Sequence, residues 1–173
     1  DLGAEKFMDI KCPKADIKPD CVVLTVTVRA LKYNAGISYQ QINSEDIEAL
    51  KKGLSNLEVH IENLKKFTSH IIVVLNKFTT DTNEEIEVIR NLCIEKEVQF
   101  SISEAYSKGG IGAIALADKV TKICELESDF KTLYDKYDSN TTLALIAYNA
   151  GQGNLDRWIN EGLVTDKKSY YNL

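Results

Sequence analysis

The sequence predicts an α/β fold: a parallel sheet of at least three strands with crossover helices, followed by a short all-helical tail. Apolar, β-branched runs alternate with amphipathic helical segments between residues 21 and 124. This order is typical of right-handed βαβ crossovers and a parallel sheet. A chain of 173 residues also has room for one domain with a hydrophobic core and an appendage rather than for two full domains.

The first strand is expected in CVVLTVTV, residues 21–28, because a continuous apolar and β-branched run is typical of a strand buried on both faces. A long polar connection then leads to an amphipathic helix in EDIEALKKGLSNLEVHIENLKKF, with Ser44 as its expected N-cap. Apolar residues at steps of three and four form the predicted inner face of this helix: Ile47, Leu50, Leu54, Leu57, Ile61 and Leu64.

Two further strand and helix pairs follow. The segment HIIVVLNKF, residues 70–78, leads through TTDTN into a helix, and VQFSIS, residues 98–103, leads through EAYSKGG into another. The first of these helices is expected to bury Ile86, Ile89, Leu92 and Cys93. The second is expected to bury Ile114, Ala117, Val120 and Ile123 or Cys124.

The pattern changes from about residue 140. TTLALIAYNA predicts a short apolar helix, which GQG ends, and NLDRWINEG predicts a second helix with Asn154 as N-cap and an end near Gly162. No strand pattern follows, so the tail is predicted to be a helical hairpin.

Composition excludes two classes of partner. The net charge is -5 and no Lys/Arg run exceeds a pair such as Lys167-Lys168, which argues against a nucleic-acid surface. No apolar run reaches the roughly 18 residues of a spanning helix, which argues against a membrane protein.

The cysteines predict neither disulfides nor a metal site. Cys12, Cys21, Cys93 and Cys124 form no CxxC pair, and the two histidines lie far from them in the sequence. Free, mostly buried thiols are expected, and with them a reducing compartment such as the cytoplasm.

A ligand is expected beyond the carboxyl ends of the strands, where loops and helix N-termini gather in a parallel sheet. Three polar segments lie there: RALKYNAGI, NKFTTDT and SEAYSKGGIG. Phe78 and Tyr106, on neighbouring loops, are placed to hold a flat heterocycle between them. The other candidate ligand residues are Arg29, Lys32, Asn76, Asp81, Lys108, Gly109 and Gly110.

A nucleotide-hydrolysing site is not predicted. VVLNKFTTD is similar to the NKxD loop by which GTPases read guanine, but Thr79 stands where the base-reading Asp is needed. The chain also contains no GxxxxGK[ST] phosphate loop, so no catalytic residue is assigned.

Residues 1–135 closely resemble an internal portion of the formate-tetrahydrofolate ligase family. The matching segments, in order, are DLGAEKFMDIKC, KPDCVVLTVTVRALKYNAG, GLSNLEVHIENLKKF, VVLNKFTTDTNEEI, SEAYSKGGIG and FKTLYD. The resemblance implies ATP-dependent formylation of tetrahydrofolate in the cytoplasm, in a possible oligomer. It also implies that Phe78 and Tyr106 flank the pterin ring. Tyr106 stands where the family usually has Trp, Thr79 where it has Pro, and Ala35 where it has Gly.

The family's phosphate-binding loop lies upstream of the matched portion and is not in this sequence. ATP and tetrahydrofolate are the ligands of the full-length family. This chain is therefore expected to be a fragment that binds tetrahydrofolate weakly, holds no cofactor and is inactive alone.

Residues 136–173 have a different resemblance. LALIAYNAGQGNLDRWINEG looks like the YNAG segment of the lytic murein transglycosylases, which implies that Tyr148 and Asn149 line part of a sugar cleft. The family's upstream general-acid glutamate has no counterpart here. The expected organisation is a ligase-like unit, residues 1–135, joined chimera-like to an incomplete tail, residues 136–173. The alternatives are a peptidoglycan lytic transglycosylase and a non-catalytic α/β scaffold.

Overall fold

The computed structural model describes residues 2–164, which form two compact units. One unit is Lys18–Phe130, and the other combines Leu2–Ile17 with residues 131–164. The Lys167-Lys168 pair and the end of the predicted tail, residues 165–173, lie outside the described residues.

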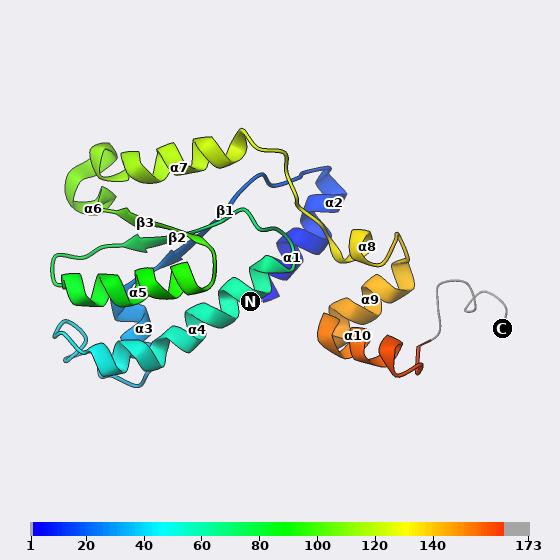
Figure 1. Cartoon of the computed structure of the whole chain (residues 1–173), viewed down its shortest axis with the longest axis horizontal. Coiled ribbons are helices and arrows are strands. Elements are labelled where there is room, and N and C mark those ends of the chain that lie inside the picture. Colours follow the sequence, from blue (N-terminus) through cyan, green and yellow to red (C-terminus); the bar gives the residue numbers. More distant parts are fainter. Residues whose placement is uncertain (1, 165–173) are drawn as a thin grey trace. The chain divides into compact units, whose positions relative to one another are not determined.

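Within residues 18–130 the strands form a three-stranded parallel sheet in the order β1-β2-β3 (Figure 1). Val73 of β2 lies opposite Leu24 of β1 and Phe100 of β3. Strand β2 is central and buried over its first five residues, as its unbroken apolar run predicts. The predicted α/β fold is confirmed. The strands are β1 (Val22–Val26), β2 (Ile71–Asn76) and β3 (Gln99–Ser103).

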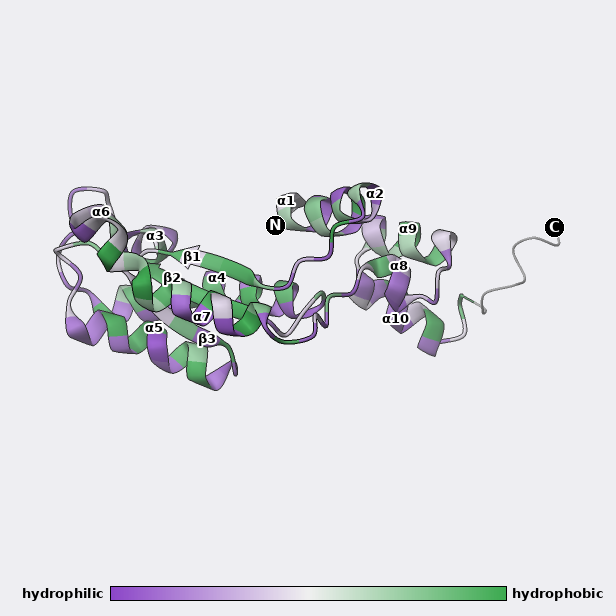
Figure 2. Ribbon diagram, turned by 90° about the horizontal axis from the view of Figure 1, so that it is seen from above, coloured by the Kyte–Doolittle hydropathy of each residue, from purple (hydrophilic) through white to green (hydrophobic). Residues whose placement is uncertain are grey.

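Helices connect these strands and cover the sheet. The helices of this unit are α3 (Val28–Asn34), α4 (Ile47–Lys65), α5 (Asn83–Glu95), α6 (Ala105–Lys108), the short 3-10 turn η2 (Gly109–Ala113) and α7 (Ile114–Cys124). Figure 1 shows α4 and α5 on one side of the sheet and α7 on the other. Hydrophobic and hydrophilic bands alternate along α5 and α7 in Figure 2.

The main core lies between the sheet and the helices α3, α4 and α5. The expected inner residues of α5 are all buried, and so are four of the six expected in α4, namely Leu50, Leu57, Ile61 and Leu64. Leu54 packs against this core while partly exposed.

The prediction of which α7 residues are buried is mostly wrong. Ile123 is buried, but Ile114 is 54% exposed, Ala117 and Cys124 are exposed, and Val120 is only half-buried. In residues 18–130 no second long helix lies beside α7 on its side of the sheet (Figure 1). A lone helix on a narrow sheet buries only the side chains that point directly at the strands.

Two predicted caps are also corrected. Asp46, not Ser44, caps α4 by accepting a hydrogen bond from the Ala49 amide at 2.9 Å. Helix α10 begins at Gln152, two residues before the predicted cap Asn154, whose side-chain amide donates to the Ala150 carbonyl at 2.7 Å.

The second unit is helical. It contains α1 (Leu2–Lys6), the π-helical turn η1 (Phe7–Lys11), α2 (Cys12–Ala15), α8 (Leu133–Lys136), α9 (Thr141–Ala150) and α10 (Gln152–Asn160). Gly151 separates α9 from α10 with a φ of 86°, a conformation that glycine adopts without strain. The predicted hairpin of two short helices is therefore present. Its core is formed by Leu133, Tyr137, Leu143, Ala147 and Leu155.

The four cysteines are free thiols, but only two of them are fully buried, fewer than the sequence predicted. Cys12 and Cys93 are buried, Cys21 is half-buried and Cys124 is exposed. Within residues 2–164 no cluster of His, Cys, Asp and Glu is suited to hold a metal ion. None of the helices described in this range is long and apolar enough to span a membrane.

Asp129, near the end of the α/β unit, anchors the residues that lead into β2. Its carboxylate accepts hydrogen bonds from the Thr68 hydroxyl, the Ser69 amide at 2.8 Å and the Ser69 hydroxyl at 2.5 Å. Burial raises the pKa of Asp129, but the hydrogen bonds from Ser69 and Thr68 outweigh it and lower the pKa to about 2.

We expect Asp129→Asn to destabilise the α/β unit at pH 7 by about 1 kcal/mol, because charge-assisted bonds to a partly exposed carboxylate are lost. The folded pKa is below the unfolded value of about 3.9, so the stabilisation is present above pH 4 and lost as the pH falls toward 2. Urea unfolding at both pH values should show the difference between the two proteins shrinking in acid. Asp118→Asn, at an exposed position on α7, is the control, and a pH-independent difference would contradict the assignment.

Candidate functional site

The three predicted ligand loops lie at one edge of the sheet, because the carboxyl ends of parallel strands point the same way (Figure 1). Helix α3 follows β1, the segment 77–82 follows β2, and α6 with η2 follows β3. Hydrogen bonds and ion pairs join each loop to its neighbour.

The loop after β2 is closed by Asp81. The Phe78 amide donates to Asp81 Oδ2 at 2.8 Å, and the Asp81 amide donates back to the Phe78 carbonyl at 3.1 Å. Burial raises the pKa of the Asp81 carboxyl, and the Phe78 hydrogen bond and the charges of Arg29 and Lys32 oppose that rise. This turn fixes the backbone from which the Phe78 ring projects.

Arg29 lies against the Phe78 ring. Its guanidinium carbon is 4.0 Å from the ring centroid, and Nη2 donates to Thr80 Oγ1 at 3.4 Å. Arg29 stands in the first turn of α3, where Thr27 accepts from the Ala30 amide at 3.0 Å as the N-cap. The first and second loops thus meet through a cation–π contact that covers one face of a half-buried Phe78.

Lys32, one helical turn further on, is buried rather than presented to a ligand. Its ammonium lies 2.7 Å from Glu85 Oε1 and also donates to the Ser44 carbonyl at 2.8 Å. Both side chains are almost fully buried, at 2% and 0% exposure.

Glu85 links this pair to the loop after β2. It forms a capping box with Thr82 at the start of α5, accepting from the Thr82 amide at 3.1 Å, and it also accepts from the Asp46 amide at 3.3 Å. Lys32 and Glu85 therefore hold α3, α4 and α5 together behind the site.

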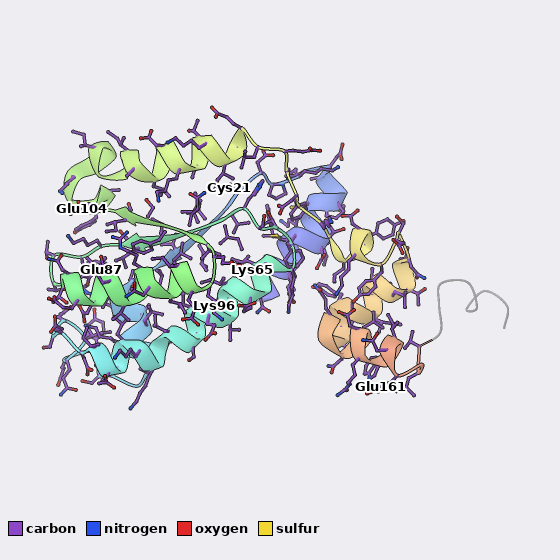
Figure 3. All side chains as sticks on the ribbon, in the orientation of Figure 1. Cys21, Lys65, Glu87, Lys96, Glu104 and Glu161 are labelled. Atoms are coloured by element: carbon purple, nitrogen blue, oxygen red, sulfur yellow. The ribbon has the colours of Figure 1, made fainter. Side chains whose placement is uncertain are left out.

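The loops after β2 and β3 are joined by charge. The Lys77 amide donates to the Ser103 carbonyl at 2.9 Å, and Glu104 lies 3.7 Å from Lys77 Nζ and 2.6 Å from Lys108 Nζ. Lys108, and then Lys77, lower the pKa of Glu104. Figure 3 places Glu104 where β3 gives way to α6, the helix on which Tyr106 stands with 90% of its surface exposed.

Two glycines in this loop have backbone roles. Gly109 has a φ of 61°, which favours glycine, and a Cβ at Gly112 would lie 2.5 Å from the Glu104 backbone. The Gly112 carbonyl accepts from the Glu104 amide at 2.9 Å. Gly110 has open space around it, and α7 begins only at Ile114, after the η2 turn.

The structure thus brings Arg29, Phe78 and Asp81 into one connected group and links Lys108 to it through Glu104 and Lys77. Asn76, the last residue of β2, lies opposite Ser103. The remaining candidates, Tyr148 and Asn149, belong to the second unit. Tyr148 packs partly buried against its core, and the exposed Asn149 donates to the Leu145 carbonyl at 2.8 Å.

Sequence reasoning did not single out Glu85, Lys77 or Glu104. The Thr82-x-x-Glu85 spacing is a capping-box signal that could have indicated the local role of Glu85. Its pairing with Lys32, 53 residues away in the sequence, has no comparable signal.

The family model for formate--tetrahydrofolate ligase matches residues 1–162. The chain belongs to the formate-tetrahydrofolate ligase family. The match includes all three strands, the connected loops at their carboxyl ends and the helices through α10. The family match does not test three of the predictions, which remain predictions. They are the transglycosylase resemblance of residues 136–173, the chimera-like join and the division at residue 135.

Proposed function

We propose that the carboxyl edge of the sheet binds the pterin ring of tetrahydrofolate, the substrate that a formate-tetrahydrofolate ligase formylates. The observation that carries this proposal is the fixed position of Phe78. Asp81 holds its backbone and Arg29 covers one face of its ring. A ring held in this way loses little conformational freedom when a flat heterocycle stacks on its other face.

Tyr106 is the proposed second ring of the site. It is 90% exposed, so it has room to cover a ligand without displacing a packed neighbour. Its loop is attached to that of Phe78 by the Lys77–Glu104 ion pair at 3.7 Å. The two aromatic side chains therefore come from adjoining loops, and the pterin would lie between them.

The charges around these rings favour an anionic group on the ligand. Lys77 and Lys108 share the single carboxylate of Glu104, which leaves an excess positive charge beside Tyr106. The carboxylates of the folate glutamate are suited to this place. Lys32, whose ammonium is already paired with Glu85, supports the loops instead of contacting the ligand.

We further propose that residues 1–173 bind folate without catalysing formylation alone. Phosphoryl transfer from ATP needs a preorganised cradle of amides and cations, for which this sequence offers no phosphate-loop motif. In a full-length family enzyme, other residues would bind ATP and the formyl phosphate. The function that we assign to this chain is therefore folate binding, as a portion of a cytoplasmic formate-tetrahydrofolate ligase.

We expect Phe78→Leu to weaken tetrahydrofolate binding about two- to tenfold, because leucine keeps apolar volume but loses the stacking energy of a ring. Isothermal titration calorimetry under reducing conditions measures the change directly. Tyr106→Leu should weaken binding by a similar factor.

Phe7→Leu, a partly exposed aromatic position in the second unit, is the matched control and should leave the affinity unchanged. If wild-type protein gives no saturable heat, or if all three variants bind equally well, the proposed site is wrong.

A further inference from the structure

Arg29 carries a positive charge that no ion pair within residues 2–164 neutralises. Three cation–π contacts occur in the part of the chain that the structure describes: Arg29 over Phe78 at 4.0 Å, Arg90 over Phe100 at 4.8 Å and Lys136 over Tyr137 at 5.2 Å. In the second contact, Arg90 is also paired with Glu87 at 2.9 Å. In the third, Lys136 is paired with Asp156 at 2.6 Å. The contact at the candidate site is therefore the one in which the cation keeps its full charge.

The guanidinium of Arg29 is also poorly hydrogen-bonded within the described residues. Nη2 donates to Thr80 Oγ1 at 3.4 Å, which is long for a hydrogen bond, and the buried Nε has no partner. Asp81 interacts with Arg29 through space, but its carboxylate accepts from the Phe78 amide instead. Leaving a half-buried cation so poorly paired costs free energy, so its presence beside the candidate site points to a role for the charge.

The charge acts on the ring that the guanidinium covers. A cation against one face of an aromatic ring draws the π-electron density of that ring towards itself. The opposite face of Phe78 is therefore less negative than a face of an unpolarised phenyl ring. Because two electron-rich faces repel one another, a ring with a less negative face stacks best on an electron-rich partner.

The oxidation state of a pterin decides whether it is such a partner. In the tetrahydro form, the amine nitrogens of the reduced ring donate electron density to the pyrimidine ring. In the fully oxidised form both rings are aromatic and electron-poor, and the flat area is larger. An unpolarised phenyl ring would gain more from stacking on the larger oxidised pterin. The polarised face of Phe78 favours the reduced pterin instead.

We propose that Arg29, through the ring of Phe78, makes the site select a reduced, electron-rich pterin over an oxidised one. Arg29 acts on the ligand only through Phe78 and does not touch it. The inference rests on the proposed folate function, because it requires the pterin to stack on the free face of this ring. It goes beyond that function by naming the residue that sets the preference between the two forms of the substrate.

The ratio of the dissociation constants of folate and tetrahydrofolate measures this preference. Both ligands have the same glutamate tail, so any contact between Arg29 and the tail carboxylates cancels in the ratio. Isothermal titration calorimetry of the full chain under reducing conditions should give tighter binding of tetrahydrofolate. Arg29→Met keeps an unbranched side chain over Phe78 without the charge and should lower the preference about two- to fivefold. Arg29→Lys keeps the charge and should retain most of the preference.

Two further variants separate selection through the ring from a general loss of structure. Arg90→Met removes the charge of the other arginine that stacks on a ring of this unit, and it should leave the preference unchanged. Phe78→Leu should lower the preference because the polarised ring is gone. Arg29→Met added to Phe78→Leu should then have no further effect on the ratio, whereas a purely structural role would change both affinities alike.

The outcomes separate this inference from the folate function on which it rests. If the wild type binds neither ligand, the proposed folate site is wrong and the inference falls with it. If both ligands bind but Arg29→Met weakens them by the same factor, Arg29 contacts the tail or supports the loop, and only the inference is overturned. An equal loss of preference in Arg90→Met, or a further loss when Arg29→Met is added to Phe78→Leu, would also overturn it.

Discussion

Glu85→Ala should lower the free energy of unfolding of the α/β unit by about 3–5 kcal/mol, since it leaves the Lys32 ammonium buried without its partner. Both side chains are at most 2% exposed, so water cannot replace the missing carboxylate in the native packing. The substitution also removes the acceptor of the Thr82 and Asp46 amides. Urea unfolding followed by circular dichroism would measure the loss.

Glu84→Ala is the matched control, because Glu84 lies in the same helical turn but is exposed, and its replacement should change stability by about 0.5 kcal/mol or less. Combining Lys32→Met with Glu85→Leu removes both charges and should recover part of the loss. If the single and double variants are equally destabilised, the unpaired charge is not the cause.

Gly53→Ala should destabilise the same unit by about 1–3 kcal/mol, although alanine is normally the better helix former by about 1 kcal/mol. Gly53 stands in α4 where the helix touches the backbone of α3. A Cβ there would lie 2.0 Å from the Leu31 carbonyl oxygen and 2.6 Å from its carbon. Because backbone atoms cannot rotate away, the two helices would have to separate.

Gly153→Ala should have the opposite effect on stability from Gly53→Ala. Gly153 stands in α10, and a Cβ there has no neighbouring atom within 4 Å, so this substitution should stabilise the second unit by up to about 1 kcal/mol. Thermal unfolding of the two variants should therefore show shifts of opposite sign. A stabilising shift for Gly53→Ala would contradict the close approach of α3 and α4.

The Gly53 contact also bears on the proposed folate site. Helix α3 carries both Arg29 and Lys32, so a displacement of α3 from α4 would move the guanidinium away from Phe78. A Gly53→Ala protein that still folds should consequently bind tetrahydrofolate more weakly than the wild type.

Much of the α/β architecture could be predicted because burial leaves a strong pattern in the sequence. Strand β2 is buried along nearly its whole length and reads as an unbroken apolar run, and α5 buries a regular stripe. Helix α7 has a similar periodicity, yet most of the expected face is exposed. Periodicity reports which residues share a face and not how much of that face a narrow sheet can cover.

The loops of the candidate site could be located from the order of strands and helices, but their internal contacts could not. Nothing local indicates that Arg29 stacks on Phe78, or that Lys32 faces a buried carboxylate instead of a ligand. Those contacts join residues about 50 positions apart and depend on how the helices pack. A lysine in a polar segment is therefore predicted to contact a ligand, and only the three-dimensional structure reveals that it pairs with a buried carboxylate.

The divided second unit has a consequence for the order of events during synthesis. Residues 2–17 leave the ribosome before the α/β unit, but their partners in residues 131–164 follow only after the entire α/β unit. The bond between the Leu133 amide and Asp9 spans 124 positions, and closing so long a flexible loop costs about 4 kcal/mol of entropy. Prior folding of residues 18–130 would shorten the flexible part and reduce that cost. Residues 2–17 are thus expected to acquire their native contacts after residues 18–130, although they are made before them.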